Sequence, residues 1–198
     1  MKLNWAERLV VNNPFRVMEQ ALEIQWFKRK MFLNKEAVLL EIGCGRGAGA
    51  RLINEAFRPH HLFIMDVDIV MIQMAKAYFS CNNREKISMY VGDAASLPFR
   101  TGSLDAVFGF GFLHHVPDWR KALQEIARIL KTGGVYFMEE LFPSLYQNFI
   151  TKHILQHPNQ DRFFSYDLRK ALAELHLILE EAIEFKKLGI LGIAKKGR

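Results

Sequence analysis

Short apolar runs alternate along the chain with longer segments in which apolar residues recur every three or four positions. The short runs are typical of buried strands, and the longer spacing is typical of helices that pack on one face. An amphipathic helix is predicted first, at residues 16–30. The predicted strands that follow are 37–42, 61–66, 86–92, 104–112 and 135–140, and the predicted helices are 48–57, 68–79, 118–130 and 165–176.

The order of these elements predicts the fold class. Strands that alternate with helices of this length form a parallel sheet covered on both faces, joined by right-handed crossovers. The segment 177–196 looks like two strands joined tightly at Gly189, which adds an antiparallel hairpin to a sheet edge. Asp68 is the expected N-cap of one helix, and Gly133 the expected left-handed cap at the end of another. We therefore expect a Rossmann-like, doubly wound α/β fold with an N-terminal helical segment.

The composition is that of one globular domain. Half of the 198 residues are hydrophobic and 24% are charged. No apolar run approaches the roughly 18 residues that span a bilayer, and charged and amide residues interrupt the first 15 residues, so neither stable membrane insertion nor a signal peptide is expected. We expect a cytoplasmic domain over 1–198, with a helical cap at 1–35 and a substrate lid at 141–165. Cys44 and Cys81 are expected to be reduced thiols.

The net charge of +6 could attract anionic partners, but much of it lies near the ends of the chain. A basic helix end and a basic tail are usually only solvated, so no nucleic-acid partner is expected. The oligomeric state stays open at this point. The basic residues near the first predicted strand and at the end of the chain are Lys28, Arg29, Lys30, Lys35, Lys195, Lys196 and Arg198.

The stretch VLLEIGCGRGAGARL, at 38–52, places four glycines on alternate positions between a predicted strand and a predicted helix. Glycine lets a backbone approach a ligand closely and adopts positive φ without cost. The letters GCGRGA also fit the G-x-G-x-x-A fingerprint of dinucleotide binding. The spacing alone leaves open a dinucleotide, another nucleotide cofactor, or a sharp turn with no ligand.

Acidic residues accompany the predicted strand ends, where open α/β sheets bind their ligands. Glu41 closes the first strand, Asp66 closes the second, Asp93 follows the third and Asp105 opens the fourth. Asp66 comes 21 residues after Gly45, the offset at which a carboxylate accepts hydrogen bonds from ribose hydroxyls. Asp66 is therefore the predicted nucleoside acid.

Several motifs together resemble the class I S-adenosylmethionine-dependent methyltransferases, in particular the small-molecule branch that includes the quinone C-methyltransferases. Their order and spacing along nearly the whole chain match the family. The resemblance implies the sheet order 3-2-1-4-5-7-6 with strand 7 antiparallel. The motifs are LLEIGCGRG, MDVDIVMIQMA, GDAASLPF, LDAVFGFGFLHHVPD and ARILKTGGVYFMEE.

The resemblance also implies the cofactor and its contacts. S-adenosylmethionine carries an ammonium and a sulfonium but no pyrophosphate, and Glu41 would attract the ammonium where it would repel a pyrophosphate. By resemblance, Asp66 holds the ribose, Asp93 contacts the adenine, and Ile69 and Leu97 enclose the adenine ring. The full set implied to bind the cofactor is Glu41, Gly43, Cys44, Gly45, Asp66, Val67, Asp93, Ala94 and Gly109.

The candidate catalytic residues follow the fourth predicted strand directly. Methyl transfer from a sulfonium requires mainly an in-line nucleophile, and a base helps when the acceptor is a carbon or a hydroxyl. His114 and His115 are the base candidates, although a capping role fits the same position. His153 and His157 stand four residues apart, but without an evident third ligand no metal is expected.

The acceptor is expected to be a small, largely apolar or aromatic molecule methylated on oxygen or carbon. Aromatic residues after Glu140 indicate an apolar lid, and they are Phe142, Tyr146, Phe149, Phe163 and Phe164. An RNA methyltransferase is the alternative within catalysis, but FGFGFLHH stands where base-methylating relatives carry N/D-P-P-Y. The alternative outside catalysis is a nucleotide-binding module without turnover.

Overall fold

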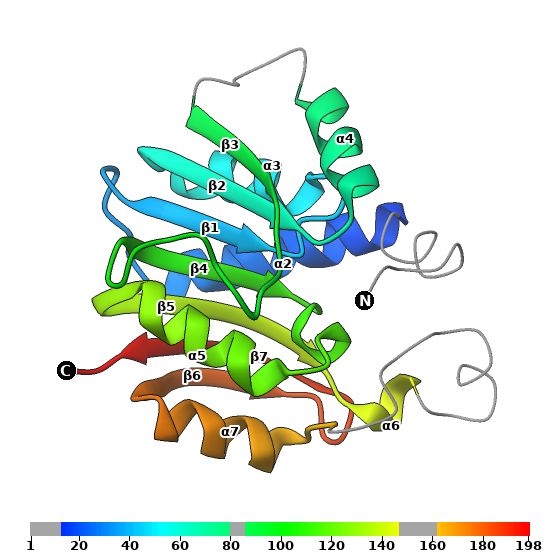
Figure 1. Cartoon of the computed structure of the whole chain (residues 1–198). Helices are drawn as coiled ribbons and strands as arrows, with labels where there is room; N and C mark the ends of the chain where they lie inside the picture. Colours follow the sequence, from blue (N-terminus) through cyan, green and yellow to red (C-terminus); the bar gives the residue numbers. More distant parts are fainter. Residues whose placement is uncertain (1–12, 80–85, 147–161) are drawn as a thin grey trace.

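A computed structural model describes residues 13–79, 86–146 and 162–198 of the chain, and its centre is a seven-stranded sheet. The strand order is β3-β2-β1-β4-β5-β7-β6, in which β1 to β5 are parallel and β7 is antiparallel to both of its neighbours (Figure 1). The predicted fold class, strand order and C-terminal hairpin are therefore confirmed. The strands are β1 (Val38–Ile42), β2 (His61–Asp66), β3 (Ile87–Val91), β4 (Leu104–Phe110), β5 (Leu130–Leu141), β6 (Leu177–Glu184) and β7 (Gly189–Lys196).

Helices cover both faces of the sheet. One face carries α2, α3 and α4, and the other carries α5 and α7 (Figure 1). The predicted N-cap of α4 is confirmed, because Asp68 accepts a hydrogen bond from the N–H of Val70 at 3.0 Å. The helices are α2 (Pro14–Lys30), α3 (Ala48–Phe57), α4 (Ile69–Tyr78), α5 (Trp119–Ile129), α6 (Pro143–Tyr146) and α7 (Ser165–Glu174), with a 3-10 turn η2 (Leu113–His115).

Packing of Phe27 fixes the position of α2. Its ring is fully buried, 4.9 Å from the ring of Phe137 and 6.1 Å from the ring of Phe110. Burial of such a side chain contributes about 2 to 3 kcal/mol. The helix is thereby held across the sheet, with its first turn at the carboxyl ends of the strands.

The expectation that Gly133 caps the preceding helix was wrong. Helix α5 ends at Ile129, and Leu130 is already extended and pairs with Leu104 of β4. Gly133 has φ +79° but lies within β5, where the register with β4 is irregular between Leu104 and Ala106. Leu130 is buried in the sheet, so the helix ends before it and several residues before Gly133.

Candidate functional site

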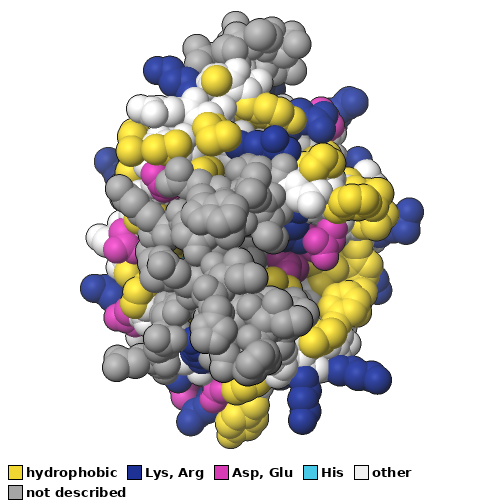
Figure 2. All heavy atoms as spheres, turned by 90° about the vertical axis from the view of Figure 1, so that its right-hand side faces the viewer, with side chains coloured by type: hydrophobic (Ala, Val, Ile, Leu, Met, Phe, Trp, Pro, Cys, Tyr) yellow, Lys and Arg dark blue, Asp and Glu magenta, His cyan; other side chains and the backbone are white. Residues whose placement is uncertain are grey.

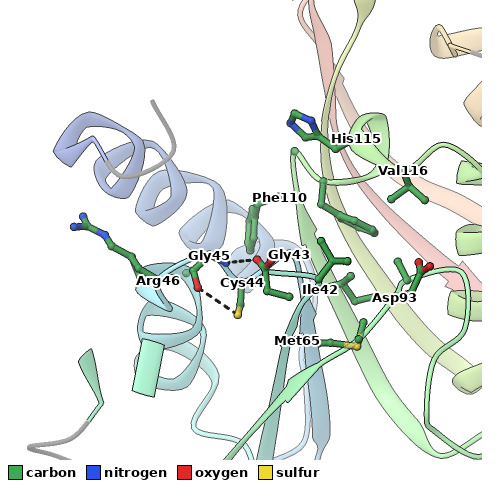
Figure 3. A pocket seen from close by; sticks show the side chains of 18 of the residues that line it. Ile42, Gly43, Cys44, Gly45, Arg46, Met65, Asp93, Phe110, His115 and Val116 are labelled. Carbon is green, nitrogen blue, oxygen red and sulfur yellow. Dashed lines mark hydrogen bonds between the residues drawn. The ribbon is translucent and has the colours of Figure 1, made fainter. Parts of the chain in front are cut away.

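A cavity of about 300 Å³ lies at the carboxyl ends of the strands. The loop after β1 lies on one side of it, and the segments after β3 and β4 lie on the other (Figure 3). Its position is where doubly wound sheets bind ligands. The lining residues are Arg16, Gln20, Ile42, Gly43, Cys44, Gly45, Arg46, Ala48, Gly49, Met65, Asp66, Val67, Gly92, Asp93, Ala94, Phe110, Gly111, Phe112, His115, Val116 and Pro117.

The glycine-rich loop presents bare backbone to this cavity. The N–H of Gly43 donates to the carbonyl of Met65 at 2.8 Å, which ties the loop to β2. Gly45 has φ +52°, and a Cβ built on it would meet nothing within 4 Å. Glycine is needed there for its backbone conformation, and the open space beside it is the space that a ligand can occupy.

Asp66 faces the cavity with its carboxylate held by backbone groups. Its Oδ2 accepts from the N–H of Gly45 at 3.0 Å, and its Oδ1 accepts from the N–H of Asp68 at 2.9 Å. Burial raises the pKa of Asp66, and these two hydrogen bonds oppose that rise. Each carboxylate oxygen can accept a second hydrogen bond, so the group is oriented and can still receive two ligand hydroxyls.

Glu41 was expected to contact the cofactor, but it does not line the cavity. It lies beneath Gly49, where an added Cβ would collide with its carboxylate. Burial, and secondarily the negative charge of Asp66, raise the pKa of Glu41 to about 8. Its Oε2 has no hydrogen-bond partner within the part of the chain that the structure describes. Buried acidic groups beside a cavity favour a cationic ligand over a pyrophosphate, so this donor set fits S-adenosylmethionine.

The raised pKa makes the contribution of Glu41 to stability depend on pH. Between the unfolded value of 4.5 and the folded value of about 8, the folded protein holds a proton that the unfolded chain releases, so stability falls as pH rises. We expect Glu41→Gln to gain stability relative to the wild type by about 2 to 3 kcal/mol between pH 5.5 and 7.5, since one proton changes stability by about 1.4 kcal/mol per pH unit. Urea unfolding at the two pH values measures this, and a difference that is constant with pH contradicts it.

Asp93 and Ala94 line the cavity as expected, and Asp93 lies on the side opposite the glycine loop (Figure 3). The Oδ1 of Asp93 accepts from the N–H of Ala95 at 2.9 Å, which fixes the turn after β3. Val67 also lines the cavity, and 44% of it is exposed. Val67 after β2, and Asp93 and Ala94 after β3, therefore line the same cavity as Gly45.

Ile69 and Leu97, which were expected to enclose the adenine, do not line the cavity. Leu97 is buried in the core, and its N–H donates to Glu125 at 2.7 Å. Ile69 is 47% exposed and lies in a separate hollow between α4 and β3.

Gly109, which was expected to contact the cofactor, and Asp105, one of the acids considered at the strand ends, do not line the cavity. Gly109 does not line the cavity, because the ring of Phe112 packs against it. Asp105 is at the amino end of β4, on the opposite edge of the sheet. It accepts from the N–H of Val38 at 2.9 Å and from the ammonium of Lys131 at 2.7 Å. Asp105 therefore connects strands and is not near the cavity.

The structure separates the two histidines of η2. His115 lines the cavity and is half-buried (Figure 3), whereas His114 is buried and does not line it. The Nδ1 of His114 lies 2.9 Å from Oε2 of Glu140, whose Oε1 accepts from the N–H of Leu113 at 2.9 Å. Burial raises the pKa of Glu140 to about 8. Glu140 and His114 thus fix the turn that places His115 at the cavity.

Sequence reasoning missed Arg16 and Gln20, which α2 brings to the cavity. The guanidinium of Arg16 contacts Glu139 at 2.6 Å and Glu23 at 3.1 Å. Burial raises the pKa of both carboxyl groups. No sequence spacing connects Arg16 with Glu139, because the contact depends on how α2 crosses the sheet.

The segment expected to form a lid is described only in part. Phe142 and Phe163 are buried in the core that includes Trp119, and the rings of Phe163 and Trp119 lie 4.6 Å apart. These two aromatic residues therefore pack in the core, and the lid itself stays a prediction. Phe164 is 46% exposed. Phe149, the side chain of Tyr146, both His153 and His157, and Cys81 lie outside the described residues, whereas Cys44 is a buried free thiol.

Within residues 13–79, 86–146 and 162–198 there is neither a candidate membrane-spanning helix nor a candidate metal cluster. No helix in these ranges combines the length and the apolar character needed to cross a bilayer. The same residues include no group of three or more His, Cys, Asp or Glu side chains placed to hold a metal ion.

The chain is similar in sequence to proteins that are named as methyltransferases. A demethylmenaquinone methyltransferase of Lactococcus lactis is 36% identical over 110 residues, which are 54% of this chain and 43% of the relative. A fatty-acid O-methyltransferase of Mycolicibacterium smegmatis is 31% identical over 105 residues, 53% of this chain and 37% of the relative. The matches thus span less than half of these relatives.

Solved structures support the same fold. The complex between the Haloferax volcanii Trm112 methyltransferase activator and the putative methyltransferase matches with a TM-score of 0.79 and 18% identity, over 100% of both chains. A putative methyltransferase from Bacillus halodurans matches with a TM-score of 0.74 and 16% identity, over 89% of this chain and all of that one. A family model described as "Methyltransferase domain" matches residues 40–138, which include the glycine loop, Asp66, Asp93 and η2. The chain therefore belongs to the methyltransferase domain family, among the class I S-adenosylmethionine-dependent methyltransferases.

Proposed function

We propose that this protein is an S-adenosylmethionine-dependent methyltransferase that methylates a small, largely apolar or aromatic acceptor on oxygen or carbon. One observation carries the proposal: the bare backbone of Gly45 and the carboxylate of Asp66 are hydrogen-bonded to each other at the mouth of one cavity. When bound, the cofactor supplies an electrophilic methyl group on a sulfonium.

Different residues of this chain would hold different parts of the cofactor. Asp66 accepts hydrogen bonds from the ribose hydroxyls, and the turn at Asp93 and Ala94 receives the adenine. The loop from Gly43 to Gly45 lies against the methionine portion. The buried carboxyl group of Glu41 lies beneath the loop without lining the cavity, and the positive charge of a bound cofactor would favour its ionised form.

The ribose assignment is tested by Asp66→Asn. An amide keeps one acceptor oxygen and places a donor where the second oxygen stood, beside a backbone N–H of Gly45 or Asp68. Hydrogen bonds to charged groups are worth about 1.5 to 3 kcal/mol, so we expect the dissociation constant of the cofactor to rise roughly ten- to several-hundred-fold. Turnover at saturating cofactor should fall much less, because the ribose contact is the same in the ground state and the transition state.

Asp68→Asn is the matched control, because asparagine caps a helix about as well as aspartate. Calorimetric titration of both variants with the cofactor separates the two acids. Weaker binding by Asp68→Asn together with normal binding by Asp66→Asn would show that the ribose acid is Asp68.

Apolar side chains favour an apolar acceptor. They line the cavity together with His115, and they are Ile42, Met65, Phe110, Phe112, Val116 and Pro117. The names of the relatives also support an acceptor of this class, since those proteins are named for demethylmenaquinone, fatty acids and phthiotriol dimycocerosates. His115 is the base that collects the acceptor proton, and His114 with Glu140 positions it.

The proposal is tested by incubating the protein with methyl-labelled S-adenosylmethionine and a panel of quinols, phenols, long-chain fatty acids and total RNA. We expect label in an apolar or aromatic acceptor. Label in RNA alone would overturn the acceptor class. Tight cofactor binding without label in any acceptor would instead indicate a nucleotide-binding module. The solved structure of the [4+2]-cyclase SpnF matches with a TM-score of 0.74 and 15% identity, so the fold alone does not imply methyl transfer.

A further inference from the structure

Helix α2 carries large apolar side chains on its outer face as well as on its inner face. Phe15 is 74% exposed, Met18 59% and Leu22 68%. Their spacing of three and four residues places them on one stripe along the helix, away from the buried Ile24 and Phe27. We call Phe15, Met18 and Leu22 the outer stripe.

The outer stripe is more than a scatter of exposed residues. Single apolar residues are common on protein surfaces, whereas contiguous apolar patches mark sites of interaction with proteins or membranes. Hydrophobic side chains gather on the right-hand side of Figure 2, the side of the molecule on which α2 and α3 lie. Phe32, just after the helix, is 87% exposed.

Cationic side chains continue from the outer stripe at the last turn of α2. Arg29 follows Leu22 by seven residues and so lies on the same stripe, with Lys28 beside it. Neither forms an ion pair with any described residue, whereas Lys30 pairs with Glu181 at 3.2 Å. One exposed acid, Glu19, lies on the same side of the helix. Both side chains are exposed, as contact with an external anion requires.

We propose that the outer face of α2 docks on the surface of an anionic lipid bilayer. Apolar side chains followed by Lys and Arg suit this surface, because the former enter the boundary of the acyl chains and the latter meet headgroup phosphates. The net charge of +6 is of the matching sign. Docking leaves the helix in the plane of the interface and requires no membrane-spanning segment.

The same helix reaches the cofactor cavity from its inner side through Arg16 and Gln20. Docking therefore holds the cavity next to the lipid, where an apolar acceptor is dissolved. This last step rests on the proposed function, whereas vesicle binding itself depends only on the surface of α2. Failure of methyl transfer would leave the docking measurement interpretable.

The test is sedimentation of the full chain with vesicles of phosphatidylcholine alone and of phosphatidylcholine with 30% phosphatidylglycerol. We expect binding to the anionic vesicles and little to the neutral ones. The double variant Phe15→Ser with Leu22→Ser should require more than tenfold more lipid for half-maximal binding. Its control, Val70→Ser with Met74→Ser, removes half-exposed apolar residues from α4 and should bind as the wild type does.

The contribution of the cations is tested by the double variant Lys28→Gln with Arg29→Gln. Each cation near an anionic surface is worth about fivefold in binding, so the pair should weaken it about 20- to 30-fold. Its control, Lys121→Gln with Lys170→Gln, removes exposed cations of α5 and α7 on the opposite face of the sheet. Circular dichroism and S-adenosylmethionine binding in solution confirm that each variant is folded.

Three results would overturn the proposal. Equal vesicle binding by the wild type and the outer-stripe variant would show that the stripe does not contact lipid. Loss of vesicle binding by Lys28→Gln with Arg29→Gln, but not by the outer-stripe variant, would indicate attraction to any polyanion. A wild-type dimer in light scattering that the outer-stripe variant dissociates, without vesicle binding by either, would assign the stripe to a second copy of the chain.

Discussion

Replacing Gly45 by valine is expected to abolish measurable binding of S-adenosylmethionine while the protein stays folded. A side chain at this position enters the open cavity, since no described atom lies within 4 Å of its Cβ. The valine methyl groups therefore occupy ligand space, and we expect the dissociation constant to rise more than about a thousandfold, a loss of about 4 kcal/mol. Calorimetric titration with the cofactor and its demethylated product measures this.

Gly102→Val is the matched control for backbone strain. Gly102 has φ +63°, and a Cβ on it also meets nothing within 4 Å, but it lies in the turn before β4 and does not line the cavity. Both variants carry the cost of a branched residue at positive φ, roughly 1 to 2 kcal/mol. Gly102→Val should bind the cofactor normally. Normal binding by Gly45→Val would mean that the glycine serves the turn alone.

Replacing His115 by alanine is expected to lower the turnover number by roughly a hundred- to ten-thousand-fold, the range that a positioned base contributes. The dissociation constant of the cofactor should change by less than about twofold, because His115 acts on the acceptor side of the cavity. The measurement is turnover at saturating cofactor with the acceptor found in the labelling experiment.

The exposed His60 provides the control, because it lies outside the cavity, beside Glu36 at 3.6 Å. His60→Ala should leave turnover unchanged. Undiminished turnover by His115→Ala would remove His115 from the chemistry and assign proton removal to solvent or to the acceptor itself.

Most of the fold was predictable because local signals agreed with the tertiary structure. The run at 61–66 and the helix at 48–57 have the predicted bounds, since each apolar pattern ends at a residue that also ends the element. The cap at Gly133 was wrong because a glycine signals positive φ but not the element to which it belongs. Its place within β5 depends on the pairing of Leu130 with β4, which is a non-local contact.

The site was predictable where residues follow strands directly. Asp66 and Asp93 were found because a strand end fixes their position at the carboxyl edge. The roles of His114 and His115 could not be separated from sequence, because neighbours in a turn point in different directions. That separation depends on the position of Glu140, 26 residues from His114. Arg16 could not be predicted as a site residue because its position also depends on a non-local contact, with Glu139, which is 123 residues away.

Calorimetric titration of the wild-type protein with S-adenosylmethionine, its demethylated product and NAD is the most direct test that the cavity beside Gly45 and Asp66 binds a sulfonium nucleoside. We predict binding of the first two in the micromolar range and no heat with NAD. Tight NAD binding without any heat from S-adenosylmethionine would contradict the assignment of this site.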